Sequence, residues 1–154
     1  MPIAQTLLIC LHLLAAALWV GGMAVMHFAV RPAAVATLEP PQRLAFMAAT
    51  LARFFAWVGV AIVVLFASGL AMIMMAGGFA AAHWSVHAML AVGIVMMLIF
   101  GHIRFGPYPR LQRAVAALAW KDAAQQLNAI RVLVALNLAL GTGVFVLASA
   151  GRAA

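Results

Sequence analysis

The chain has 154 residues, of which 69% are apolar and 7% are charged, and its formal net charge at pH 7 is +7. About a quarter of the residues of a soluble domain are charged, so this composition excludes a soluble globule and favours a single membrane-embedded domain over residues 1–154. The positive charge does not indicate a nucleic-acid partner, because the basic residues lie beside apolar segments and form no basic stripe.

Four apolar segments are long enough to cross a bilayer as helices, since about 20 such residues span the hydrocarbon core. They cover approximately residues 3–30, 54–76, 84–105 and 130–150. The predicted fold is therefore all-α, an integral membrane four-helix bundle.

Prolines mark two of the connections between these segments. After Pro40 and Pro41 the second helix is predicted to begin before it enters lipid. Pro107 and Pro109 are predicted to break the third helix. Arg110–Asn128 is then predicted to form a further helix whose basic residues lie at the membrane surface.

The basic residues also predict the orientation of the chain. Eight of the nine lie in the two connections that join the first segment to the second and the third to the fourth. Because Lys and Arg mark the cytoplasmic side, both termini are predicted to lie in the periplasm, with the protein in the inner membrane of a bacterium.

Two of the apolar segments each carry a pair of histidines fifteen positions apart. His12 and His27 lie in the first segment, and His87 and His102 lie in the third. A histidine within lipid needs a partner. We expect these two parallel helices to face each other, so that His12 shares one depth with His87 and His27 shares another with His102.

Haem is the cofactor that this pattern favours, because two imidazoles from facing helices supply the axial ligands of b-type haem iron. Three arginines near the inner pair are candidates to bind the haem propionates. One or two haems are expected, the inner pair having the alternative of contacting head groups or water. The candidate cofactor-binding residues are His12, His87, His27, His102, Arg31, Arg53 and Arg104, and the four histidines are also the candidate metal ligands.

Copper is the alternative metal, since the chain has ten methionines and thioethers suit Cu(I). Met72, Met74 and Met75 gather near the end of the second segment, although methionine is also ordinary filler in apolar helices. A third interpretation is that the protein is a structural or accessory subunit, in which the histidines pair only with each other. Asn137 in the fourth segment is expected to make a hydrogen bond between helices. With two acidic residues in the whole chain, a Ser-His-Asp hydrolase is excluded.

Several short motifs carry a resemblance to a known family. They are LHLLAAALWVGG followed by Arg31-Pro32, RFF at Arg53–Phe55 leading to Ser68-Gly69-Leu70, and Trp84 followed by the stretch Arg104–Leu111. The chain resembles the CopD-type copper-resistance membrane proteins, which implies copper uptake or tolerance.

The chain is also similar to the related HemJ-type protoporphyrinogen oxidases. There, a first-helix histidine that corresponds to His12 is associated with haem b, and a third-helix lysine follows a tryptophan. Here His87 stands at that lysine position, three residues after Trp84. This departure favours a bis-histidine haem over the oxidase.

The predicted function is transmembrane electron transfer through bis-histidine haem, carried out by a membrane oxidoreductase if the protein is an enzyme. The expected surroundings are the lipid bilayer and an electron donor and acceptor, for which a quinone or a periplasmic redox protein is suitable. Assembly into a homo-oligomer is compatible with this prediction. The alternatives are a CopD-like copper protein and a HemJ-like oxidase.

Overall fold

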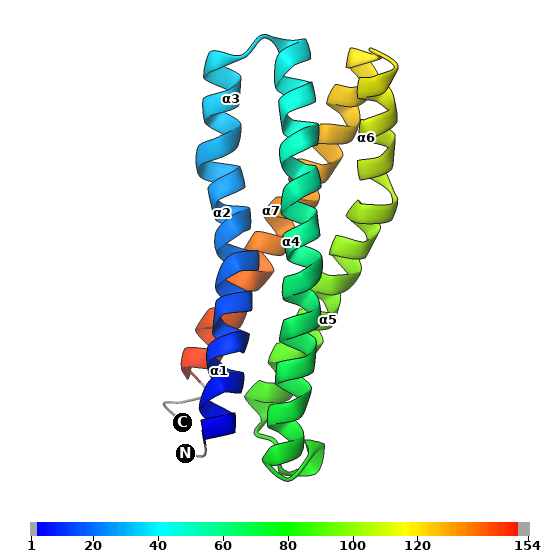
Figure 1. The fold of residues 1–154 in the computed structure, drawn as a ribbon. Helices are drawn as coiled ribbons and strands as arrows, with labels where there is room; N and C mark the ends of the chain where they lie inside the picture. Colours follow the sequence, from blue (N-terminus) through cyan, green and yellow to red (C-terminus); the bar gives the residue numbers. More distant parts are fainter. Residues whose placement is uncertain (1–2, 151–154) are drawn as a thin grey trace.

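The computed structural model describes residues 3–150, which form four long helical segments (Figure 1). Two of these segments are subdivided, and a short 3₁₀ helix precedes the third. In chain order the elements are α1 (Ile3–Ala16), the π-helical turn η1 (Ala17–Gly21), α2 (Gly22–Val25), the π-helical turn η2 (Met26–Val30), α3 (Arg31–Thr37), α4 (Pro40–Met75), the 3₁₀ helix η3 (Phe79–Ala81), α5 (Trp84–Phe105), α6 (Pro107–Ala116) and α7 (Trp120–Ala150).

The all-α prediction is confirmed. Each of the four segments is long and apolar enough to cross a membrane, and residues 3–150 contain no strand. The helices extend past the lipid-crossing ranges expected from hydropathy, most of all α4, which has 36 residues. The boundaries of the lipid-crossing parts therefore stay predictions.

Prolines start helices where the sequence indicated. Glu39 is extended, with ψ of 152°, and α4 begins at Pro40. Gly106 interrupts the third segment with φ of −104° and ψ of −95°, and α6 begins at Pro107. Proline suits the first helical position because its missing N–H has no partner there in any helix.

The prediction of one helix over Arg110–Asn128 is wrong, because α6 ends at Ala116 and α7 begins at Trp120. The N–H of Ala119 donates to the carbonyl of Ala114 at 2.9 Å, and the N–H of Leu118 donates to that of Val115 at 3.1 Å. These are the two bonds of a Schellman cap. Leu118 holds the left-handed position of this cap, with φ of 56°. Glycine is usual there, so the sequence carried no stop signal.

The packing of the segments differs from our expectation that the first and third segments face each other. The α1 helix packs on α4, while α5 and α6 pack on α7. The α4 helix also contacts α6 and α7. The first and third segments meet at mid-depth, where the rings of Trp19 and Phe100 are 6.4 Å apart and nearly perpendicular. The bundle thus places α1 and α5 mainly against other partners.

The bundle has two ends of different character (Figure 1). We call one the basic end, because the α3–α4 and α6–α7 corners there hold most of the Lys and Arg residues. We call the other the terminal end, because α1 begins, α7 ends and η3 lies there. The basic half and the terminal half meet near the level of Trp19 and Phe100.

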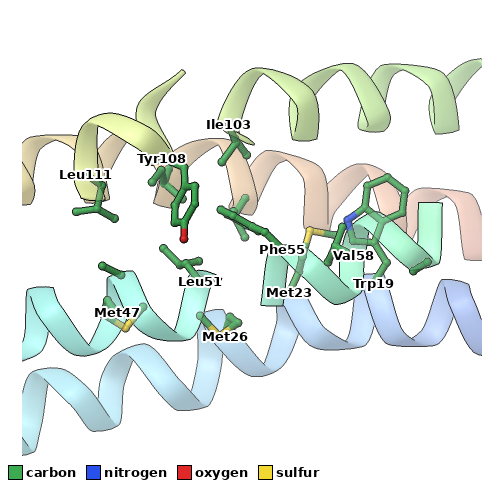
Figure 2. Packing of buried hydrophobic residues seen from close by; sticks show 14 of the residues in the cluster. Trp19, Met23, Met26, Met47, Leu51, Phe55, Val58, Ile103, Tyr108 and Leu111 are labelled. Atoms are coloured by element: carbon green, nitrogen blue, oxygen red, sulfur yellow. The ribbon is translucent and has the colours of Figure 1, made fainter. Parts of the chain in front are cut away.

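Most of the large buried side chains lie in the basic half. The ring centroid of Phe55 is 5.6 Å from that of Phe100 and 5.1 Å from that of Tyr108, both edge to face. Figure 2 shows Phe55 of α4 pointing toward Tyr108 of α6. Such aromatic pairs each contribute about 0.5–1.5 kcal/mol beyond area burial. Leu111 beside them is fully buried.

Large apolar side chains cover the outside of the bundle. Phe28, Trp57 and Phe105 are 72%, 64% and 81% exposed, respectively. Such side chains would form aggregation-prone patches in water, but they suit acyl chains. Together with the four long apolar helices, they identify a multi-pass membrane protein.

Candidate functional site

His12 is held in one orientation by the second helical segment. Its Nδ1 lies 2.9 Å from the hydroxyl oxygen of Ser68. That hydroxyl donates its one proton to the carbonyl of Val64, 2.6 Å away. With its proton on this carbonyl, the Ser68 hydroxyl accepts the bond from His12, and we assign the imidazole proton to Nδ1 on this basis. The Nε2 atom of His12 keeps a free lone pair, the form of histidine that binds metals.

A glycine beside Ser68 makes room for the imidazole ring. A Cβ atom added at Gly69 would lie 3.2 Å from Cε1 and 3.7 Å from Nδ1 of His12. That approach is tighter than most contacts between side chains. We call the pair Ser68-Gly69 the seat of His12, because Ser68 forms a hydrogen bond with the imidazole and Gly69 leaves room for its ring. His12 is half-buried and Ser68 is buried.

His87, the predicted partner of His12, is exposed on α5, and its ring centroid is 6.4 Å from that of Phe79. The main packing partner of α5 is α7, whereas His12 is held by α4. The pairing of His12 with His87 on one iron stays a prediction. His83 caps α5 by accepting a hydrogen bond from the backbone N–H of Ser85.

The remaining predicted residues lie toward the basic end and do not form one group. His27 in η2 is half-buried, with its ring 4.8 Å from that of Phe28, whereas His102 on α5 is exposed. The guanidinium of Arg104 lies over the ring of Tyr108, 5.4 Å from its centroid. Arg53 is exposed. Neither Arg53 nor Arg104 shares a cavity with His27.

A cavity of about 330 Å³ lies between η2, α3, α4 and α7 near the basic end. It brings His27 together with one predicted arginine, Arg31, and with two arginines that sequence reasoning used only as markers of topology. Its lining residues are Met26, His27, Arg31, Val35, Arg43, Leu44, Met47, Leu51, Ala124, Leu127, Asn128, Ile130, Arg131 and Val134. The lining residues come from two distant parts of the chain, residues 26–51 and 124–134, so no local motif could have identified the cavity.

Asn137 makes the hydrogen bond between helices that we expected. Its side-chain N–H₂ donates to the carbonyl of Met96 at 3.2 Å. Asn137 is 2% exposed, and its Oδ1 has no hydrogen-bond partner in the described chain. The bond fastens α7 to α5 just on the terminal side of mid-depth.

Histidine, cysteine and acidic side chains do not assemble into a metal cage within residues 3–150, where no group of three could hold an ion. A metal bound there would need other ligands besides one histidine. Thioethers of methionine or the nitrogens of a macrocycle are the available chemistry.

Comparison with known proteins gives one result. The family model described as "Copper resistance protein D" (CopD) matches residues 48–150, well over half of the chain. The matched region includes Ser68, Gly69, His87 and Asn137, whereas His12 and His27 precede it. Searches of curated proteins and of solved structures returned no significant match.

Proposed function

Because the chain belongs to the CopD family of copper-resistance membrane proteins, we propose that it binds copper(I) within the membrane through Nε2 of His12. The observation that carries this proposal is the hydrogen bond from His12 to Ser68. Histidines that ligate metals usually donate their other ring N–H to a fixed acceptor, which sets the tautomer and the ring orientation. His12 has this arrangement in a position where an unused imidazole would be costly.

Methionines on α4 supply the further ligands in this proposal. Residues four and seven positions apart share one face of a helix, so Met72 and Met75 lie on the same face of α4 as Ser68, toward the terminal end. Met72 is half-buried and Met75 is exposed. One imidazole nitrogen and two thioether sulfurs suit the soft Cu(I) ion. The copper is the cargo of the protein, consistent with a role in copper uptake or tolerance.

A second candidate is b-type haem with His12 as an axial ligand and His87 as the proposed second one. The observation that favours it is the lone oriented imidazole, because a porphyrin supplies four of the six iron ligands. The protein would then be a membrane oxidoreductase that passes electrons between a quinone and a periplasmic redox protein. A second haem between His27 and His102 has less support, because α5 forms no wall of the cavity that His27 lines.

Purified protein in detergent distinguishes the two candidates. We expect a colourless protein that competes with a Cu(I) chelator for one ion per chain. His12→Ala should lose this binding, and His102→Ala at the opposite end is the matched control that should retain it. A Soret band that is lost in His12→Ala and His87→Ala would favour haem. Equal Cu(I) affinity in wild type and His12→Ala would reject the copper site.

A further inference from the structure

The geometry of the basic-end cavity points to an anion site: we propose that it binds the phosphate headgroup of an anionic phospholipid, with one acyl chain along its apolar wall. This site lies at the other end of the bundle from His12. It is independent of the copper proposal, since neither site shares a residue with the other.

Charge is the first argument for an anionic ligand. Arg31, Arg43 and Arg131 come from α3, α4 and α7, and all three are half-buried around one cavity. The chain has two acidic residues, Glu39 and Asp122, and neither lines the cavity. No carboxylate of the cavity lining therefore offsets the positive charge of the three guanidinium groups. Arginine binds phosphate through paired, charge-assisted hydrogen bonds.

The shape of the lining is the second argument. Polar groups from His27 and Asn128 join the arginines, while the rest of the wall is aliphatic or thioether, including Leu44, Leu51 and Val134. An anion with an apolar body matches both the basic part and the apolar part of this lining. A fully hydrated inorganic anion matches only the basic part. Basic pockets between transmembrane helices bind phospholipid headgroups in this way.

The π-helical turn η2 helps to build the site. Single π-helical turns inside α-helices occur frequently at functional sites. Here η2 contains both Met26 and His27, and Arg31 and Val35 follow His27 at intervals of four. These residues form a continuous strip on the first segment that faces α4 and α7 across the cavity.

Other occupants fit less well. A copper ion would meet three positive charges and no anionic ligand. Haem held by both His27 and His102 would need α5 in the cavity wall, which comes from η2, α3, α4 and α7. The exposed Arg110 and Arg113 on α6 are sufficient to mark the membrane side, so topology alone does not account for three arginines that converge on one cavity.

The test titrates the full-length protein in detergent with phosphatidylglycerol, and with phosphatidylcholine of the same acyl chains, and counts bound lipid by native mass spectrometry. We expect one tightly bound phosphatidylglycerol per chain. Arg131→Gln should raise its half-saturating concentration about tenfold, the factor that corresponds to 1.4 kcal/mol. Arg110→Gln removes the same charge from an exposed position and should change it little.

Several results would overturn the proposal. They are equal retention of both lipids, equal losses in Arg131→Gln and Arg110→Gln, and protection from thermal unfolding by inorganic phosphate alone that matches protection by phosphatidylglycerol. Haem bound in place of lipid, detected by its Soret band and lost in His27→Ala, would overturn it as well. If Arg131→Gln does not fold, Arg131→Lys keeps the charge without the planar fork and should weaken binding by a smaller factor.

Discussion

The basic half and the terminal half of the bundle are built from different kinds of residues. In the basic half, many of the buried side chains are large, among them Phe55, Tyr108 and Leu111 between α4 and α6, and the small Ala34, Ala48 and Ala123 are buried beside them. In the terminal half, beyond the level of Asn137, the buried residues among those described are small or polar with one exception, Ile73. They are Ala15, Ala61, Ser68, Ile73, Ser85 and Gly141.

This difference indicates that the two halves of the bundle have different roles. Helices in lipid gain little from the hydrophobic effect, so close packing and hydrogen bonds must hold them together. The basic half supplies the packing and can set the fold of the whole bundle. The terminal half is thereby free to hold a polar site, the seat of His12, at a modest cost in packing.

The largest expected effect is in the aromatic core. Phe55→Ala should destabilise the protein by about 3–5 kcal/mol, because the cavity left between Phe100 and Tyr108 removes most of the contacts of a buried ring. Phe66→Ala makes the same truncation at a side chain that is about half exposed in the terminal half, and should cost less than about 1 kcal/mol. Unfolding in mixed micelles measures both. Equal losses would break the proposed division.

A close helix contact marks the boundary between the halves. A Cβ atom at Gly141 would lie 2.7 Å from Cγ2 of Val20 and 3.1 Å from Cε of Met96. Gly141→Ala should therefore cost about 1–3 kcal/mol through overpacking. Gly143 lies on the same helix with nothing within 4 Å of an added Cβ, so Gly143→Ala should stabilise by about 0.5 kcal/mol through helix propensity. If Gly141→Ala is as stable as Gly143→Ala in the same unfolding assay, the boundary contact is absent.

The seat of His12 should affect metal binding far more than stability. Ser68→Ala removes the acceptor that fixes the imidazole, and should lower Cu(I) affinity about 10-fold, at the lower end of the range for supporting hydrogen bonds. Ser85→Ala changes a buried serine elsewhere in the terminal half and serves as the control. Chelator competition measures both variants. A loss of affinity that is equal in the two would mean that Ser68 only supports the fold.

The smallest effect is expected at the α6–α7 corner. Leu118 has φ of 56° and is 67% exposed, so its backbone is strained and its side chain is not packed in the core. Leu118→Gly should stabilise the protein by about 1 kcal/mol, because glycine adopts this conformation without the Cβ penalty. Leu38→Gly, next to α3, is a control at a leucine with an ordinary φ of −119° and should not stabilise. A drop in the unfolding midpoint for Leu118→Gly would contradict the cap assignment.

Hydropathy and proline positions were enough to predict the four helical segments, since both signals are local. The partner of Asn137 was also predictable in kind, because a buried amide in lipid needs one. The cap at Leu118 was not predictable, since alanines flank it and no glycine marks it.

One residue of the candidate site, His12, was predicted from the sequence, but the residues that surround it were not. His12 stood out as a histidine in an apolar helix, but its partner Ser68 is 56 positions away. The expected symmetry of two histidine pairs assumed that α1 and α5 pack together, whereas α1 packs on α4. Arg43 and Arg131 carried only a topological meaning until the fold brought them to one cavity with His27.

The most direct test of the His12 site is X-ray absorption at the copper edge of Cu(I)-loaded protein. We predict one imidazole nitrogen together with sulfur scatterers in the wild type, and loss of the imidazole signal in His12→Ala with retention in His102→Ala. An unchanged copper spectrum in His12→Ala would contradict the assignment of His12 as the metal ligand.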